Sequence, residues 1–346
     1  MKELKHMEIN EMLAKLCVPA GVSGAEEPAC EAALELLREY VPDAVMDDFG
    51  CVCGFLGDRE NGKPTLLLEA HIDEIGFIVT YIDEKGFIKA ASCGGTDNRL
   101  YAAQTVTIHG KYPIKGVITT LPPHVSSGEK KPMKTDEMVI DAGYSAEKLR
   151  ETVSLGDRIT IDGEFGALGE KRVTGKALDD RSGVAAVLYA LSLLKGKELP
   201  FNISVLFASQ EEVGSRGAIM GAYRACADYA IATDVSFAHT PDAPKEKCGK
   251  MGAGTMIGIS PSLSKSVTAR LRSLAEELGI PFQLEVMGSG TGTDADDIAV
   301  TRGGVKTGLV SIPLKYMHTP VEVVETADVE ATGRLMAAFA ERGVAE

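Results

Sequence analysis

The sequence predicts an α/β protein in which helices cover both faces of a mixed, largely parallel central sheet, with a small β-barrel domain inserted into it. Three observations support this class. After residue 170, apolar strand-like runs alternate with helical patterns, which is typical of a parallel sheet. Between residues 76 and 165, short β-rich runs alternate with Gly, Pro and Asn turns. With 346 residues, 45% of them apolar, the chain is long enough to bury a large core.

The expected elements follow this order along the chain. Before the insertion we expect two helices, the second over residues 26–41, and a buried strand over residues 64–73. Within the insertion, β-rich runs are expected over residues 76–83, 86–91, 104–110, 115–121 and 158–165. After it, helices are expected over residues 182–195, 216–225 and 264–279, and strands over residues 201–210, 229–235 and 307–317. Candidate site residues occur on both sides of the insertion. Residues 1–75 and 166–346 are therefore expected to form one discontinuous catalytic domain, with residues 76–165 inserted.

Composition excludes several classes of partner. The net charge of −14 and the isoelectric point near 5.0 argue against nucleic acid or an anionic membrane as the binding partner. No apolar run approaches the roughly 18 residues of a membrane span. The N-terminal residues mix charges into a helical pattern and show no secretory signal. The seven cysteines are odd in number and scattered, which indicates reduced thiols and a cytoplasmic location.

Six polar side chains stand where predicted strands or helices begin or end. They are His71, Asp179, Glu211, Glu212, Asp234 and His318. Ligands of open α/β sheets bind beyond the carboxyl ends of the strands, so we expect these residues at one rim of the sheet. Two imidazoles and four carboxylates can hold two divalent metal ions and leave one carboxylate free to act as a base. The pattern therefore indicates metal-assisted hydrolysis.

Each segment taken alone also has a simpler interpretation. His71 and Asp73 point to the same side of a strand, either as a metal-binding imidazole held by a carboxylate or as a strand-end salt bridge. Asp179 is either a helix cap or a carboxylate that bridges two metals. Glu211 and Glu212 follow a buried strand, where carboxylates must be paired, protonated or bound to a cation. Alternatively, the carboxylates of these two residues are simply exposed to solvent and have no role in a site.

Other features of the sequence are less informative. A mixed set of imidazole and carboxylate ligands suits zinc, cobalt or manganese, and the sequence does not choose among them. The glycine-rich segment 288–295 lacks the spacing of a phosphate-binding loop, and we expect a loop that lines the substrate site. His124 and His239 could each border the site.

Five motifs occur in an order that resembles the tetrahedral aminopeptidases, which are also catalogued as glutamyl aminopeptidase or cellulase M. The motifs are H-x-D at 71–73, K-A-L-D-D-R at 176–181, S-Q-E-E-V-G-x-R-G-A at 209–218, A-T-D-V at 232–235 and Y-M-H-T-P-V-E at 316–322. The resemblance covers essentially the whole chain. It implies a fold like that of the zinc exopeptidases and an enzyme that removes N-terminal residues from peptides with a free N-terminus.

The resemblance also implies roles for individual residues. One metal would be held by His71, Asp179 and Asp234. The other would be held by Asp179, Glu212 and His318. Glu211 would act as general base, and Asp73 would orient a metal ligand.

The family further implies homo-oligomers, namely dodecamers built from dimers, with the inserted domain contributing to assembly and to the substrate pocket. Lys315 departs from the Arg that many relatives carry, but it keeps the charge and leaves the ligands intact.

Three other functions are compatible with parts of the sequence. A metal-dependent deacylase or carboxypeptidase would use the same site and would accept substrates without a free amine. A glycoside hydrolase could work with two carboxylates but gives no role to the two histidines. A non-catalytic binding or assembly protein would have no use for a complete ligand set with its base. Metal-dependent aminopeptidase activity is the function that the sequence favours.

Overall fold

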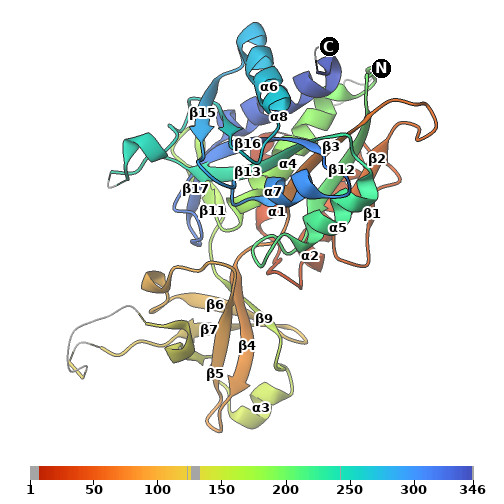
Figure 1. Ribbon diagram of the computed structural model, residues 1–346. Helices are drawn as coiled ribbons and strands as arrows, with labels where there is room; N and C mark the ends of the chain where they lie inside the picture. The colour runs from red at the N-terminus through yellow and green to blue at the C-terminus, as the bar shows by residue number, and fades with distance from the viewer. Residues whose placement is uncertain (1–7, 123, 126–132, 242, 345–346) are drawn as a thin grey trace.

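The computed structural model describes residues 8–122, 124–125, 133–241 and 243–344. Its larger part is built on a sheet that contains eleven strands within these residues, in the order β1-β2-β12-β3-β13-β16-β17-β11-β10, with β14 pairing β15 and β16 (Figure 1). The strands are β1 (Val45–Met46), β2 (Val52–Leu56), β3 (Thr65–His71), β10 (Gly166–Leu168), β11 (Arg172–Gly175), β12 (Asn202–Ala208), β13 (Tyr229–Phe237), β14 (Thr255–Ile259), β15 (Phe282–Val286), β16 (Lys306–Lys315) and β17 (Glu322–Glu325).

The centre of this sheet is parallel. β12, β3, β13 and β16 are parallel neighbours, whereas β2 and β17 add to the two sides of this group in antiparallel orientation. All seven residues of β12 are buried, as expected for a strand that is covered on both faces. The carboxyl ends of the parallel strands therefore meet at one edge of the sheet.

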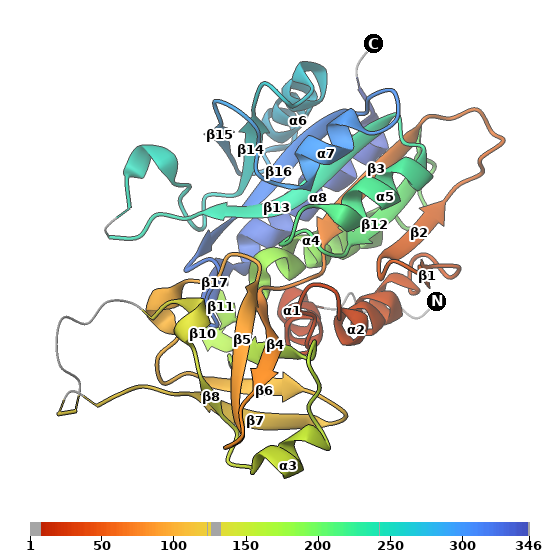
Figure 2. The ribbon, with the colours of Figure 1, turned by 60° about the horizontal axis from the view of Figure 1, so that its bottom comes forward.

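Helices cover both faces of the sheet (Figure 2). Leu66 and Leu68 of β3 pack into a core with α1 (Ile9–Cys17), α2 (Glu27–Leu37), α4 (Leu178–Leu194), α6 (Lys265–Leu278) and α8 (Thr326–Arg342). Leu67 points to the opposite face, where it packs with α5 (Arg216–Ala225) and α7 (Asp294–Val300). Successive side chains of a strand alternate between faces, so one leucine run supplies both cores.

A closed barrel interrupts the sheet between β3 and β10. Its strands are β4 (Gly76–Ile82), β5 (Phe87–Cys93), β6 (Thr105–His109), β7 (Pro113–Ile118), β8 (Ile140–Asp141) and β9 (Arg158–Ile161), which close in the order β4-β5-β8-β7-β6-β9. The barrel has its own apolar core, which includes Phe77, Val106 and Ile159, and the short helix α3 (Ala146–Arg150) lies beside it. It forms a separate lobe next to the helix-covered sheet (Figures 1 and 2).

The predicted fold class is confirmed: the protein has a mixed, largely parallel sheet between helices and a small closed barrel. The prediction was wrong where residues 288–295 were expected to form a loop throughout, because α7 begins at Asp294, with the Thr293 hydroxyl accepting a hydrogen bond from the N–H of Ala295. β14, β15, β17 and α8 were not predicted. Among the described residues, none of the helices combines the length and the apolar character that crossing a membrane requires.

Candidate metal centre

The predicted site residues come together at the carboxyl edge of the parallel strands. His71 is the last residue of β3 and lies opposite Ala208, the last residue of β12. Glu211 and Glu212 follow β12 directly, and Asp234 lies in β13. His318 follows β16, where its φ of 62° turns the chain back toward the sheet. Four strands of one parallel group thus bring these residues to a common edge.

Asp179 lies between the two histidines. Its Oδ1 is 3.1 Å from Nε2 of His71, and its Oδ2 is 3.3 Å from Nε2 of His318. The backbone departs from helical dihedral angles at Asp179 and Asp180, so the regular part of α4 begins after them. This departure lets the carboxylate of Asp179 turn toward the strand ends. One carboxylate therefore faces two imidazoles with its two oxygen atoms.

Both imidazoles are oriented by a backbone carbonyl. Nδ1 of His71 lies 3.2 Å from the carbonyl oxygen of Asp73, and Nδ1 of His318 lies 2.6 Å from that of Gly95, a residue of the barrel lobe. A carbonyl oxygen can only accept, so each Nδ1 carries a proton and donates it. In the neutral ring, Nε2 then offers a lone pair, which is the form in which histidine binds a metal.

The remaining carboxylates lie close to these histidines. Oε1 of Glu212 is 3.4 Å from Nε2 of His318, and Oδ1 of Asp234 is 3.9 Å from Nε2 of His71. Ligand atoms of His71, Asp179 and Glu212 all lie within 4.8 Å of one another. This set of imidazole and carboxylate groups could hold a divalent cation.

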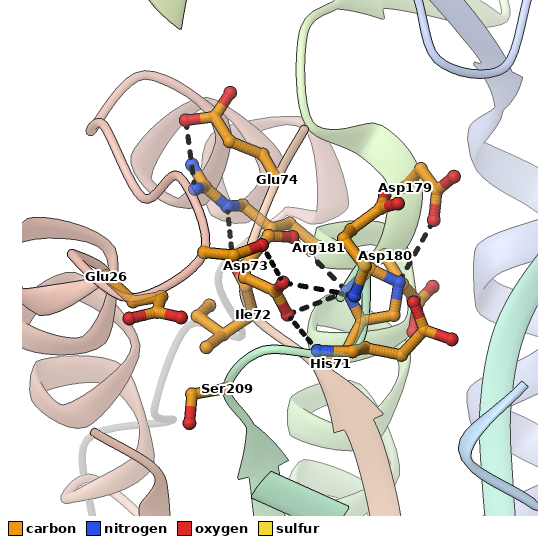
Figure 3. Close-up of polar contacts among 12 residues, drawn as sticks. Glu26, His71, Ile72, Asp73, Glu74, Asp179, Asp180, Arg181 and Ser209 are labelled. Carbon is orange, nitrogen blue, oxygen red and sulfur yellow. Dashed lines mark hydrogen bonds and ion pairs between the residues drawn. The ribbon is translucent and has the colours of Figure 1, made fainter. Parts of the chain in front are cut away.

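The carboxylate of Asp73 ties the end of β3 to the segment after β12. It accepts hydrogen bonds from the N–H groups of Glu211 (2.9 Å) and Glu212 (3.2 Å) and from the hydroxyl of Ser23 (2.6 Å). Its Oδ1 also lies 3.5 Å from Nδ1 of His71 (Figure 3). Besides its contact with the histidine, Asp73 thus holds the backbone that carries the two glutamates.

A buried ion network supports this region from behind. The fully buried guanidinium of Arg181 donates to the carbonyl of Ile72 at 3.1 Å and to Glu74 at 3.3 Å (Figure 3). Glu74 also accepts from Lys176 at 2.8 Å. These contacts fix the chain directly after His71. The carboxylate of the neighbouring Asp180 accepts a hydrogen bond from the N–H of Gly183 at 3.0 Å.

Glu322 is a supporting residue that the sequence did not reveal. Its buried carboxylate accepts hydrogen bonds from the N–H of Asp179 (3.1 Å) and from the N–H of His318 (2.9 Å). One side chain of β17 thereby holds the backbone of two candidate ligands. Its position four residues after His318 was the available signal, but nothing in that spacing indicates that the carboxylate also reaches α4.

The electrostatics of the cluster favour a cation. Burial raises the pKa of Glu211 to about 8, with a further contribution from the carboxylates of Asp294 and Glu212. Burial likewise holds the pKa of Asp234 well above its ordinary value. Burial opposes ionisation of Asp179 too, but the hydrogen bonds from His318 and His71 hold its pKa below the ordinary value.

The same hydrogen bonds act on the histidines. Burial lowers the pKa of His318, yet the carboxylates of Asp179 and Glu212 raise it to about 11. The buried carboxyl groups outnumber the imidazoles, so their full ionisation would leave negative charge in excess at this edge. Two further carboxylates, Glu69 and Asp294, are buried nearby, and within the described residues none of their oxygen atoms has a hydrogen-bond partner. A bound cation would offset this excess charge.

A cavity of about 690 Å³ opens over the cluster. Its walls contain the candidate ligands together with residues of β13, β14, β15 and β16 and of the loops that follow them. Residues 291–293 of the glycine-rich segment line it, as expected. His124, His239 and Lys315 are not among the described residues that line the cavity.

The fold and the site together define an α/β enzyme with a candidate metal centre at the carboxyl edge of its sheet. The family follows from comparison with known proteins. The chain belongs to the M42 glutamyl aminopeptidase family, whose model matches residues 50–335. It is therefore an aminopeptidase, a hydrolase that acts on peptides, and the predicted resemblance is confirmed.

Individual relatives match along nearly their whole length. A lysyl aminopeptidase of Pyrococcus furiosus is 29% identical, with 96% of each chain covered. The structure of an aminopeptidase from the archaeon Desulfurococcus kamchatkensis is 34% identical with a TM-score of 0.90, covering 97% of this chain and 95% of that one. The TET1 peptidase of Pyrococcus horikoshii, which can assemble into a tetrahedron or a large octahedral shell, is 32% identical with a TM-score of 0.86, covering 97% and 100%.

Proposed function

We propose that this protein is a dinuclear metal-dependent aminopeptidase that hydrolyses N-terminal residues from peptides. The observation that carries the proposal is the position of Asp179, whose two carboxylate oxygens lie 3.1 Å and 3.3 Å from Nε2 atoms of two different histidines. A carboxylate that bridges two metals needs one oxygen for each. Two metal ions held by the two histidines could therefore share this carboxylate, one through each oxygen.

The ligand sets follow from this bridge. One ion would be held by His71, Asp179 and Asp234, and the other by Asp179, Glu212 and His318. The donor set fits divalent zinc, cobalt or manganese, because it combines imidazole nitrogens with carboxylate oxygens. The carbonyl acceptors on both Nδ1 atoms add the orienting contacts that metal-binding histidines usually have.

Glu211 is the residue proposed to move protons. When bound, the ions would lower the pKa of a water molecule toward neutrality and polarise the scissile carbonyl. Glu211 accepts the proton of that water and then delivers it to the leaving amine, first as general base and then as general acid. Asp73 holds the N–H of Glu211 and thereby positions it. Burial raises the pKa of Glu211 in the metal-free protein, and bound cations would lower it so that the carboxylate can accept the proton.

The division into domains and the assembly are proposed on the same basis. Residues 1–75 and 166–346 form the catalytic domain, and residues 76–165 form an inserted domain that serves assembly and the substrate pocket. Gly95, from the inserted segment, lines the cavity and contacts His318, which supports a role at the pocket. We propose a homo-oligomer, a dodecamer by analogy with a related structure described as a dodecamer. We also propose a cytoplasmic location, which the seven free cysteines support.

Purified protein should be assayed on aminoacyl chromogenic substrates with N-acetylated controls, before chelation, after it, and after addition of zinc, cobalt or manganese. We expect chelation to abolish cleavage and one of the metals to restore it, on substrates with a free amine. Cleavage of the acetylated substrates would support a deacylase instead. Activity that persists without metal would exclude the mechanism. Native mass spectrometry would test the assembly, for which twelve copies are expected.

A further inference from the structure

The wall of the cavity away from the metal cluster contains one charged side chain that the proposed mechanism does not use. Glu285 lies in β15 and lines the cavity. Its neighbours on the strand, Leu284 and Val286, are 44% and 74% exposed, whereas Glu285 itself is half-buried. Side chains alternate along a strand, and an edge strand normally exposes its charges and hides its apolar residues. β15 does the reverse.

The carboxylate of Glu285 is only partly satisfied. One oxygen, Oε1, accepts a hydrogen bond from the hydroxyl of Ser236 in β13. The other, Oε2, is shielded from water and has no hydrogen-bond partner within the described residues. Burial raises the pKa of Glu285, although the hydroxyls of Ser236 and Ser311 oppose this shift. A buried carboxylate with an open acceptor is costly unless a cation or a donor completes it.

The distance from the metal cluster suits a long side chain. Ser236 lies two residues after Asp234 on the same strand, so both point to the same face, about 6.6 Å apart along the strand. Glu285 is hydrogen-bonded to Ser236 and therefore lies about two residues of strand length, roughly 6.6 Å, beyond Asp234 at the metal end of the cavity. The four-carbon stem of lysine can bridge a gap of this size.

The remaining walls are apolar or neutral around this carboxylate. Met256 and Leu309 are buried and line the cavity, and they can pack against the methylene groups of a long side chain. Glu246 and Lys247 also line it, but both are exposed and opposite in charge. Glu285 is thus the charged side chain that the interior of this wall presents to a substrate.

We propose that Glu285 determines specificity for peptides whose N-terminal residue is basic, lysine or arginine. This inference rests on the proposed aminopeptidase function, because it assigns the side chain of the residue that is removed to the wall formed by β13, β14 and β15. The ammonium or guanidinium group pairs with the carboxylate of Glu285, which lines the cavity. An N-terminal glutamate would instead place a second carboxylate beside Glu285 and is rejected.

The test compares three substrates, lysyl, norleucyl and glutamyl p-nitroanilide, on the wild-type protein and on Glu285→Gln. Norleucine keeps the methylene stem and lacks the ammonium group. We expect wild type to show a kcat/KM for lysine above those for norleucine and glutamate. Glu285→Gln should lower the value for lysine by about 10- to 100-fold, as expected for loss of a charge-assisted hydrogen bond, and change that for norleucine little. Glu246→Gln is the matched control, because it removes a charge from the mouth of the same cavity, and it should keep the lysine preference.

The outcomes separate the two proposals. Wild-type protein that prefers norleucine or glutamate, or a Glu285→Gln variant that keeps the lysine preference, would overturn the specificity assignment and leave the aminopeptidase standing. Failure of wild type to cleave all free-amine substrates after metal addition would overturn the proposed function itself. If Glu285→Gln loses norleucine cleavage as well, Ser236→Ala decides, since it removes the hydrogen bond that orients the carboxylate. It should lower the lysine preference in the same direction, and an unchanged preference would overturn the assignment.

Discussion

The two ends of the cavity are built from different kinds of contact. At the metal end, each group is fixed by partners from distant parts of the chain: carbonyls hold both Nδ1 atoms, and the carboxylate of Asp73 accepts three hydrogen bonds. At the far end, Glu285 accepts a hydrogen bond from the hydroxyl of Ser236, and neutral side chains such as Met256 and Ser311 line the wall with it. The difference suggests that reactivity and selectivity are separable in this protein. Changes at the metal end should lower the cleavage of every substrate. Changes at Glu285 should alter only the preference among substrates.

Asp179→Asn tests the metal end most severely. An amide cannot offer two anionic oxygens, so the variant should bind less metal and lose detectable activity on lysyl and norleucyl substrates alike. Metal content by mass spectrometry and activity with added metal would be measured together. Asp136→Asn, at an exposed position of the barrel lobe, is the control that should behave as wild type. Loss of activity on only one of the two substrates would contradict the claim that the metal end acts on all substrates alike.

Glu211→Gln separates proton transfer from metal binding. It should lower kcat by about 10²- to 10⁴-fold, the usual contribution of a general base, and leave metal content near that of wild type. The fall should be equal for all substrates, because the base acts on water and not on the side chain. A variant that retains most of its activity would show that another group takes the proton.

Glu322→Gln probes the residue that holds the backbone of two ligands. The amide keeps one acceptor and loses the other, so His318 or Asp179 should be less well positioned. We expect metal affinity to fall by about 10-fold, the lower range for residues that support metal ligands. Excess metal should restore most of the activity. If activity stays low at saturating metal, Glu322 has a role beyond positioning.

The pH dependence of thermal stability should give the smallest effect. In the metal-free protein, the pKa values of Glu211 and His318 are raised above their unfolded values, to about 8 and about 11. A raised pKa means that the stabilising contribution is complete below the unfolded pKa and is lost as the pH rises through the folded one. The Tm of chelated protein should therefore fall between pH 6 and 9, by at least about 2 °C.

Metal-loaded protein should show a smaller fall or a rise over the same pH range, because metal binding requires deprotonated ligands. Calorimetry of both forms provides the measurement. A chelated protein that gains stability with pH would contradict the proposed excess of buried acidic groups at the metal end.

The fold class and the proposed ligands could be predicted from the sequence for a common reason. His71, Glu212 and His318 each stand beside an apolar run whose end is visible in the sequence, and parallel strands carry such ends to one edge. The supporting contacts were not visible in this way. The hydrogen bonds from the backbone of Glu211 and Glu212 to Asp73 join positions almost 140 residues apart, and periodicity says nothing about such pairs.

Glu285 and Glu322 were missed for a related reason. Both lie within short strands. In β15 apolar and polar residues alternate, but two of the apolar ones are exposed, and in β17 two valines stand between two glutamates. The start of α7 at Asp294 was missed because glycines dominate the preceding residues and hide a helix of seven residues. In each case, tertiary packing decided the structure against the local pattern.

The carbonyl of Gly95 has a consequence for variants in which the barrel lobe is deleted or exchanged. It belongs to the barrel lobe, yet it is the acceptor that selects which nitrogen of His318 carries the proton. Deleting the lobe, or exchanging it for one from another protein, would therefore do more than remove a surface. It would also free the imidazole to adopt the other tautomer, so a graft has to reproduce that single oxygen atom as well as the outline of the pocket.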